Sequence, residues 1–253
     1  MATIISIVNH KGGVGKTTTS MNLSYALAQL KQKKVLVMDL DAQANLSTSL
    51  GFIPANHTTL YDILPNEGDL PIYPVHENLD IVLSSLDLAA SEMNMINEIG
   101  REKILANLIE PIERKYDYII IDCPPSLGLL TINALSTSDQ VVIVVESEFL
   151  ALEGQMRLPY TIDIIKKKLN KKLEILGVLQ TKYDSRLSLT KRVEESLKEI
   201  YGEKLFETRI RKNVALAEAP SERKTIFEYD PSSNGAQDYL ALAEEVITRT
   251  ETR

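Results

Sequence analysis

Lysines, glycines and threonines stand together after the first apolar run of this chain, in the order Lys11-Gly-Gly-Val-Gly-Lys-Thr-Thr18. Glycines let backbone N–H groups approach an anion, and a helix that follows adds the positive potential of its N-terminus. A lysine at the end of such a loop contacts the terminal phosphates of a nucleotide, and the hydroxyl after it is a ligand for Mg²⁺. The pattern predicts a phosphate-binding loop, with Lys16 on the phosphates and Thr17 on the metal.

His10 and Lys11 make this loop depart from the ordinary P-loop pattern G-x-x-x-x-G-K-[ST]. His10 stands where the first glycine of that pattern is expected, and Lys11 adds a second lysine ahead of the glycines. A lysine at that place is the signature of the deviant P-loop. The residues expected to contact the phosphates are Lys11, Gly12, Gly13, Val14, Gly15, Lys16, Thr17 and Thr18.

Three aspartates are found at or just after the ends of predicted strands. Asp39 and Asp41 come at and after the end of one apolar run, and Asp122 closes another. Because open α/β proteins bind ligands at the carboxyl ends of their strands, these carboxylates can orient water or hold hydrated Mg²⁺. Asp122 matches the acid of a Walker B strand, which faces the metal. Helix capping or solvated loop acids would explain the same residues without a ligand.

Short β-branched runs alternate with longer helical patterns along the chain. The predicted strands are 3–8, 35–39, 79–83, 118–122, 141–145 and 173–179. The predicted helices begin near Lys16, Arg101, Leu127, Phe149, Ser188 and Gly235. Strands that alternate with helices form parallel sheets, and strands apolar on both faces are covered on both sides.

This alternation predicts an α/β protein of the three-layer P-loop NTPase fold, with a mostly parallel central sheet flanked by helices. We expect a single domain that spans residues 1–253. The segment 51–74 is rich in Pro, Asn and Gly and is predicted to be a surface excursion.

Composition argues against several classes of protein. The single cysteine, Cys123, cannot form an internal disulfide and gives no support for a cysteine metal site. No apolar run is long enough for a membrane span or a signal peptide, so the expected location is cytoplasmic. The net charge of −7 is uneven, since residues 1–149 hold 9 Lys and Arg against 18 Asp and Glu, and residues 150–253 hold 19 against 17. Any nucleic-acid surface is therefore expected in the second half.

Several motifs together resemble the ParA/Soj partition ATPases, within the group that includes MinD and the nitrogenase iron protein. They are the loop 11–18, Asp39-Leu-Asp-Ala-Gln-Ala-Asn45, Tyr118-Ile-Ile-Ile-Asp-Cys-Pro-Pro125, Ala151-Leu-Glu-Gly154, Glu218-Ala-Pro220 and Tyr229-Asp-Pro-Ser-Ser-Asn-Gly-Ala236. The resemblance covers nearly the whole chain. It implies a nucleoid-associated protein that binds ATP and Mg²⁺, forms a homodimer around the nucleotide and binds DNA nonspecifically. Release would follow when a ParB-like or other adaptor protein stimulates hydrolysis.

The resemblance also implies roles for the acids. Asp41 corresponds to the residue that positions the attacking water, and Asp39 to an outer-shell ligand of Mg²⁺. Ala42 stands where the family usually has Pro. We expect this switch segment to be less rigid for that reason.

Family position assigns a special role to Lys11 and adds three further residues that are expected to contact the nucleotide. The resemblance implies that Lys11 reaches across a two-fold axis to the phosphates of the other subunit, because its side chain has no evident role within its own subunit. Glu148 occupies the position that touches the ribose of the other subunit, although a surface acid at a helix start explains it nearly as well. Pro220 and Thr181 correspond to the adenine-facing wall, with ordinary loop packing as the alternative.

A basic surface for DNA is expected from the second half of the chain. The candidate cations are Lys166, Lys167, Lys168, Lys171, Lys172, Arg186, Lys191, Arg192, Arg209, Arg211 and Lys212. Each run alone is more often a solvated face, but together in an acidic protein they favour one shared patch. By family position, Arg186 and Lys212 contact DNA phosphates without reading sequence. The run Ile210-Arg-Lys-Asn213 departs from the frequent I-P-R-N, so we expect a rearranged DNA surface.

Two other functions are compatible with the same scaffold. An enzyme related to cobyrinate amidating or dethiobiotin synthases would use ATP to activate a carboxylate. A MinD-like regulator would bind a membrane through a basic amphipathic C-terminal helix. The chain ends in LALAEEVITRTETR, with acids and no aromatic residue, so we expect no membrane partner. The motifs at 39–45 and 151–154 favour the partition ATPase, with a chromosome, a plasmid or a protein assembly as cargo.

Overall fold

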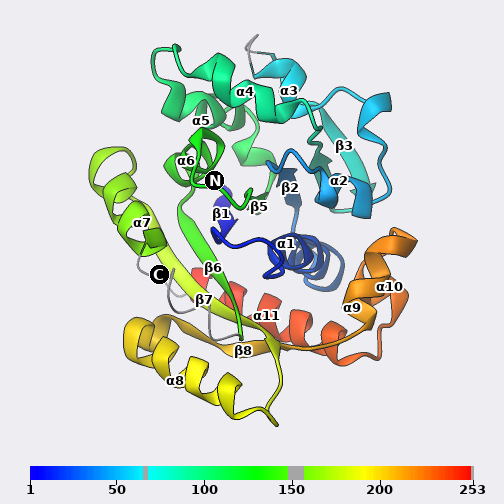
Figure 1. The fold of residues 1–253 in the computed structure, drawn as a ribbon. Helices are drawn as coiled ribbons and strands as arrows, with labels where there is room; N and C mark the ends of the chain where they lie inside the picture. The colour runs from blue at the N-terminus through cyan, green and yellow to red at the C-terminus, as the bar shows by residue number, and fades with distance from the viewer. Residues whose placement is uncertain (65–67, 148–156, 252–253) are drawn as a thin grey trace.

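A computed structural model of the chain describes residues 1–64, 68–147 and 157–251. The strands that it describes form one sheet in the order β3-β4-β2-β5-β1-β6-β7-β8 (Figure 1). Their bounds are β1 Thr3–Val8, β2 Val35–Asp39, β3 Ile72–His76, β4 Leu79–Val82, β5 Tyr118–Asp122, β6 Gln140–Glu146, β7 Glu174–Tyr183 and β8 Leu205–Arg211. Every neighbouring pair is parallel except β3 with β4. The predicted mostly parallel sheet is confirmed.

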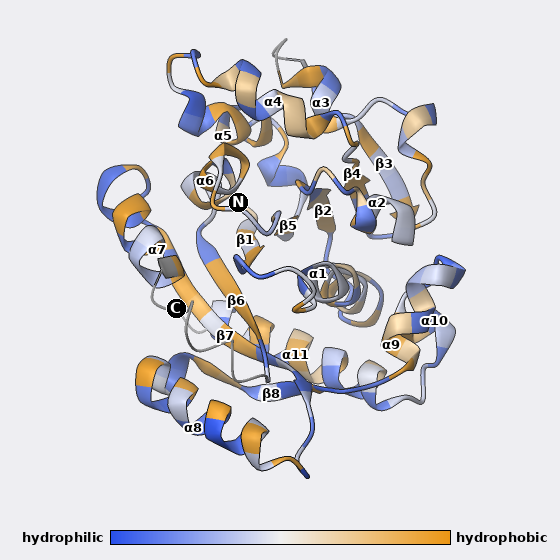
Figure 2. Cartoon of the chain, viewed as in Figure 1, coloured by the Kyte–Doolittle hydropathy of each residue, from blue (hydrophilic) through white to orange (hydrophobic). Residues whose placement is uncertain are grey.

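Helices cover both faces of this sheet (Figure 1). On one face lie α3 Leu60–Ile63, α4 Leu88–Met95, α5 Ile104–Ile109, α6 Leu129–Thr137, α7 Arg157–Lys168 and α8 Ser188–Tyr201. On the other lie α1 Lys16–Tyr25, α2 Asn45–Ser49, α9 Ala215–Glu218, α10 Ile226–Tyr229 and α11 Asn234–Glu251. Figure 2 shows hydrophobic and hydrophilic residues alternating along α8, as expected for a helix with one buried face.

The two cores are separated by the sheet because successive side chains of a strand point to opposite faces. In β1, Ile4 and Val8 join the core under α3 to α8, whereas Ile5 and Ile7 join the core under α1 and α11. A strand buried in this way must be apolar at every position, which is why the sequence runs of β1, β5 and β6 lack alternation. The three-layer prediction is confirmed.

Several predicted boundaries agree with the structure. The bounds of β1, β2 and β5 are those predicted, and α1 and α8 begin at Lys16 and Ser188. β7 continues to Tyr183, beyond the predicted end at residue 179. The helix predicted near Phe149 would begin outside the described residues.

The two edge strands, β3 and β8, were not predicted from the sequence. β3 contains Pro74, and β8 carries the polar run Glu207-Thr-Arg209. Edge strands are paired on one side only, so proline and charge are tolerated there and the apolar signal is weak. The segment 51–74 is also less peripheral than predicted, since Leu60 and Leu70 are buried in the core.

No helix in the described ranges combines the length and the apolar character that crossing a bilayer requires.

Candidate functional site

The phosphate loop joins the end of β1 to the start of α1 (Figure 1). Gly13 and Gly15 have φ values of 76° and 96°, a left-handed region in which glycine avoids the strain that a Cβ would bring. Asn9 holds the loop from beneath: its Nδ2 donates to the Val144 carbonyl at 2.6 Å, and its Oδ1 accepts the Lys11 N–H at 2.9 Å. The loop is therefore fixed by its own neighbours before any ligand arrives.

Thr181, at the C-terminal part of β7, lies under this loop. The residue is 3% exposed, and its Oγ1 donates to the Val14 carbonyl at 2.7 Å. A Cβ added to Gly15 would lie 3.8 Å from Thr181 Cγ2. Thr181 therefore supports the loop backbone, and its place in the adenine-facing wall stays a prediction.

Lys16 is the first residue of α1 and is 6% exposed. Its Nζ donates to the Lys11 carbonyl at 3.2 Å. Burial lowers the pKa of this ammonium, while the charge of Asp122 opposes that shift. A lysine carries three donors, and a buried cation is stabilised by any anion that reaches it. Lys16 is therefore placed to receive a phosphate.

Thr17 and Ser20 connect α1 to the end of β5. Thr17 Oγ1 donates to Asp122 Oδ2 at 2.8 Å, and Ser20 Oγ donates to Asp122 Oδ1 at 2.9 Å. Ser20 was not singled out from the sequence, although it stands four residues after Lys16, one helical turn further along. Both oxygens of the Asp122 carboxylate are thus held by one helix.

Two buried aspartates lie side by side at the carboxyl edge of the sheet, because β2 and β5 pair with Asp39 opposite Asp122. Both are 0% exposed. Burial first, and then the charge of the neighbouring aspartate, raises the pKa of Asp39, and burial raises that of Asp122. A cation at this edge would relieve the repulsion between them.

The donors at this edge are compatible with Mg²⁺. The hydroxyl of Thr17 and the carboxylate of Asp122 are oxygen ligands, which Mg²⁺ prefers, and Mg²⁺ usually keeps several waters instead of filling its shell with protein groups. No group of three or more His, Cys, Asp or Glu side chains that could hold a metal ion occurs among the described residues.

Asp39 accepts hydrogen bonds from the turn that follows it, whereas Thr17 donates to Asp122. The Oδ2 of Asp39 accepts Ser47 N–H at 2.9 Å and Ser47 Oγ at 2.8 Å, and its Oδ1 accepts Asp41 N–H at 3.1 Å. These bonds fix the turn from β2 into α2. The structure therefore gives Asp39 a positioning role for that turn, in addition to any contact with metal-bound water.

Asp41 is the aspartate that reaches the open side of the site. Its Oδ1 accepts the Gln43 N–H at 3.0 Å, and its carbonyl accepts Ser84 Oγ at 2.7 Å. Ala44, in the same turn, has a φ of 51°, a conformation that costs a non-glycine residue about 1 kcal/mol. The turn is anchored at both ends although Ala42 replaces proline.

A cavity of about 470 Å³ lies over the loop and brings these groups together. Asp41 lines it, as does Pro125 from the segment after Asp122. Pro220, from the turn after α9, forms another part of its lining. The loop residues that line it are Gly12, Gly13, Gly15, Lys16, Thr17 and Thr18.

Lys11 has a partner within its own subunit. Its Nζ lies 3.1 Å from Glu146 Oε2, and Lys182 pairs with the other oxygen of the same carboxylate. The expectation that Lys11 lacks an intrasubunit role is therefore wrong. These contacts lower the pKa of Glu146 although burial acts in the opposite direction. The expected ribose contact, Glu148, lies outside the described residues.

Arg186 and Lys212 line one cavity of about 650 Å³ beyond the C-terminal ends of β7 and β8. Arg186 forms an ion pair with Asp184, yet the Arg186 side chain is 86% exposed. Arg209 and Arg211 line the same cavity but are held by Glu194 and Asp238. Within the described ranges, no carboxylate pairs with Lys212. Of the four cations that line this cavity, Arg186 and Lys212, the two predicted from family position, are the ones that Glu194 and Asp238 do not hold.

The lysines of α7 belong to a different place. Lys166 pairs with Glu174, the first residue of β7, whereas Tyr183, the last residue, lines the basic cavity. A strand of 10 residues puts these ends about 30 Å apart. The prediction of one shared patch is therefore wrong for Lys166, Lys167, Lys168, Lys171 and Lys172.

The chain is similar to known proteins both in sequence and in structure. An AAA domain family model matches residues 2–175. The chain is 48% identical to the sporulation initiation inhibitor protein Soj of Bacillus subtilis, over 97% of this chain and 98% of that protein. It is 42% identical to the chromosome partitioning protein ParA of Myxococcus xanthus, over 97% of this chain and 88% of that protein.

A solved structure of cobyrinic acid a,c-diamide synthase from Mycobacterium smegmatis, with a bound ATP analog and magnesium, superposes with a TM-score of 0.88. It is 28% identical and the match covers 100% of this chain and 97% of that one. One family assignment accounts for the phosphate loop, for the acids at the ends of β2 and β5, and for the sequence similarity over nearly the full length of the chain. The chain belongs to the ParA/Soj group of partition ATPases, within the AAA domain family.

Proposed function

We propose that this chain, as a single ATPase domain of residues 1–253, is a partition or positioning ATPase that binds Mg-ATP. The observation that carries the proposal is the convergence of Lys16, Thr17 and Asp41 on one cavity, with Asp122 held beneath Thr17. Lys16 would bind the terminal phosphates, and Thr17 with Asp122 would hold the metal. Structures of related proteins with bound nucleotide and magnesium support the choice of ligand.

Asp41 is the proposed positioner of the attacking water. It lines the cavity and lies on a turn that is tied down by Ser47 and Ser84. Glu146 holds Lys11 in the isolated subunit, so Lys11 would have to exchange this carboxylate for the phosphates of a second subunit on dimerisation. A phosphate carries more charge than one carboxylate, so ATP would favour the exchange. Glu148 remains the proposed ribose contact and Pro220 the proposed adenine contact.

DNA binding would follow from dimerisation. One basic cavity offers Arg186 and Lys212 within a chain of net charge −7, which is too weak for stable attachment to DNA. Two cavities on one dimer act together, because the second contact is made at high effective concentration. Hydrolysis, stimulated by a ParB-like or other adaptor, would separate the subunits and release the DNA. The protein would accordingly be a cytoplasmic protein associated with the nucleoid.

Duplex retention tests the proposal. Immobilised duplexes of two unrelated sequences are exposed to the protein with ATP and Mg²⁺, with ADP and Mg²⁺, and without nucleotide, over a series of salt concentrations. We expect similar affinity for both sequences in ATP, a steep loss with salt and little retention in ADP. Retention that is equal in ATP and ADP would remove the proposed switch, and no retention in ATP would remove DNA as the matrix.

A carboxylate-activating enzyme is the second candidate, favoured by the superposition on the diamide synthase. Such an enzyme would consume ATP in proportion to a small carboxylic acid added with glutamine or ammonia. The partition ATPase would instead hydrolyse ATP slowly without these substrates. Phosphate release measured with and without a panel of small carboxylates distinguishes the two.

A further inference from the structure

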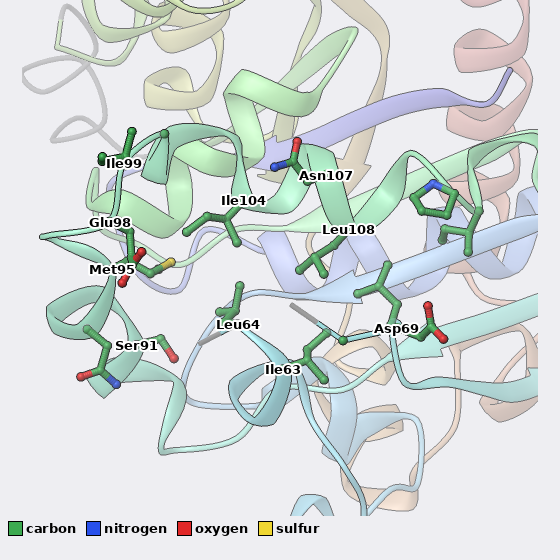
Figure 3. A pocket seen from close by; sticks show the side chains of 16 residues that line it. Ile63, Leu64, Asp69, Ser91, Met95, Glu98, Ile99, Ile104, Asn107 and Leu108 are labelled. Carbon is green, nitrogen blue, oxygen red and sulfur yellow. The ribbon is translucent and has the colours of Figure 1, made fainter. Parts of the chain in front are cut away.

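A groove of about 420 Å³, with apolar and polar side chains in its lining, lies between α3, α4 and α5, outside the nucleotide cavity. Figure 3 shows Ile63 and Leu64 on one side of it and Ile104 and Leu108 on the other. The row of hydrophobic side chains ends at Ile99, which is fully exposed at 103% of its reference area. Groups of large apolar side chains open to water in this way mark binding surfaces.

The charged side chains that line the groove are acidic. Asp69 and Glu98 line the groove at its opposite ends (Figure 3). Among the described residues, neither carboxylate pairs with a cation. Apolar side chains between two carboxylates fit a segment with apolar and basic faces, and the carboxylates would repel an anionic lipid surface.

We propose that this groove docks a basic amphipathic helix of a partner protein, with its apolar face against Leu64, Ile104 and Leu108 and its cations near Asp69 and Glu98. An apolar helix face in a hydrophobic groove is a recurring mode of recognition, and the two carboxylates set the choice of partner. The groove belongs to the acidic half of the chain, so the partner and DNA would be bound through different surfaces.

The groove is also connected to the nucleotide cavity through α4. Ser91 and Met95 of α4 line the groove, while Glu92, on the same helix, accepts the Leu130 N–H at 3.0 Å. A Cβ on Gly128 would overlap the Glu92 carboxylate, so this contact is close-packed. The start of α6 thus rests directly on α4.

The segment that leads into α6 is the one that carries Pro125, a residue of the nucleotide cavity. Thr131 Oγ1 in the first turn of α6 donates to the Ser126 carbonyl at 2.6 Å, which ties that segment to the helix. A helix docked against α4 would act on Pro125 through Glu92 and α6. This coupling, unlike the docking, rests on the proposed nucleotide site.

Docking is tested with a labelled synthetic peptide of Leu and Lys, in which the leucines recur at i, i+3 and i+4. The controls are a peptide of the same composition with scrambled order and an amphipathic peptide of Leu and Glu. Fluorescence anisotropy gives the dissociation constants. We expect the amphipathic basic peptide to bind about tenfold more tightly than either control. Equal affinity for the ordered and the scrambled peptide would overturn the groove as the site.

A matched pair of variants locates the peptide. Ile99→Lys puts a cation at the groove, and Ile200→Lys makes the same change on α8, where Ile200 is 50% exposed. We expect about tenfold weaker binding for Ile99→Lys and wild-type binding for Ile200→Lys. A second pair, Glu98→Gln and Glu195→Gln, tests one of the two carboxylates in the same way. If both members of each pair behave alike, the peptide binds by charge alone and the proposal fails.

Coupling is tested by the release rate of a fluorescent ADP analog with and without saturating peptide. We expect the rate to change several-fold in wild type and to become insensitive to the peptide in Glu92→Ala, while the peptide still binds. If the release rate in wild type does not change when the peptide is added, the proposed coupling is wrong, while the proposed docking is unaffected. Failure of the analog to bind at all would overturn the proposed function and not the groove.

Discussion

The phosphate loop and the basic cavity are built on different principles. The loop comes from one short run of sequence, and its backbone is held by buried groups such as Asn9 and Thr181. The basic cavity joins residues around Arg186, Arg209 and Asn234, which lie far apart in the sequence. Its arginines are paired with acids whose side chains are at most 15% exposed. The loop is rigid before its ligand arrives, whereas the arginines of the cavity must exchange internal ion pairs for phosphate.

Because of this difference, ligand binding in the two regions should respond differently to substitutions. A substitution in the loop removes interactions that nothing else can make, so its effect is large. A substitution in the cavity removes one of several long-range charges, and salt screens what remains. The predicted effects therefore fall from the loop to the cavity.

Lys16→Ala has the largest expected effect. The side chain is buried, and the backbone donors of the loop cannot replace its charge, so ATP affinity should fall by about 100-fold or more. Dimerisation in ATP should be lost with it. Isothermal titration with ATP and Mg²⁺ measures the affinity, with Lys198→Ala on α8 as a surface control. Wild-type affinity in Lys16→Ala would contradict the whole assignment of the site.

Asp41→Ala is expected to separate binding from hydrolysis. ATP affinity should stay within about twofold of wild type, while phosphate release should slow by about 100-fold or more, the usual contribution of a group that orients the attacking water. The protein should then persist as an ATP dimer, which light scattering would detect. Hydrolysis at the wild-type rate would move the catalytic role to another residue, with Asp39 the next candidate.

Arg186→Ala with Lys212→Ala tests the basic cavity against the lysines of α7. The double variant should bind DNA about tenfold more weakly in ATP, and the salt slope should fall by about 0.9 for each DNA phosphate that the protein no longer neutralises. Lys168→Ala with Lys171→Ala removes the same charge at the other end of the sheet and should leave both quantities near wild type. If the second pair has the larger effect, DNA binds at α7 and the cavity assignment is wrong.

Asp184→Asn should give the smallest change, a gain of about twofold to fivefold in DNA affinity at low salt, because it frees Arg186 from its internal partner. Hydrogen bonds from Arg186 are the main cause that lowers the pKa of Asp184 to about 2. The carboxylate stays ionised well above that pH, so the gain should be the same at pH 6 and pH 8. Asp163→Asn, which breaks an exposed pair with Lys167, is the control. A loss of affinity in Asp184→Asn would mean that Asp184 positions Arg186 for DNA.

The sequence alone was sufficient for the fold class, the central strands and the meeting of Lys16, Thr17 and Asp122 at one edge of the sheet. These predictions depend on local rules: a strand buried on both faces must be apolar, a loop around phosphate must be small, and an acid must follow the strand. The edge strands β3 and β8 were not predicted, because a strand that is paired on one side only has little constraint on its amino-acid composition.

Only the tertiary structure decided which distant residues meet. Glu146 belongs to none of the nucleotide-binding motifs, yet the register of β6 brings it between Lys11 and Lys182. The length of β7 parts the α7 lysines from Arg186, and α4 brings Glu92 to the start of α6. Charges act through space, and the distances between them are fixed by how strands and helices pack, so a count of lysines along the chain gives no position for them.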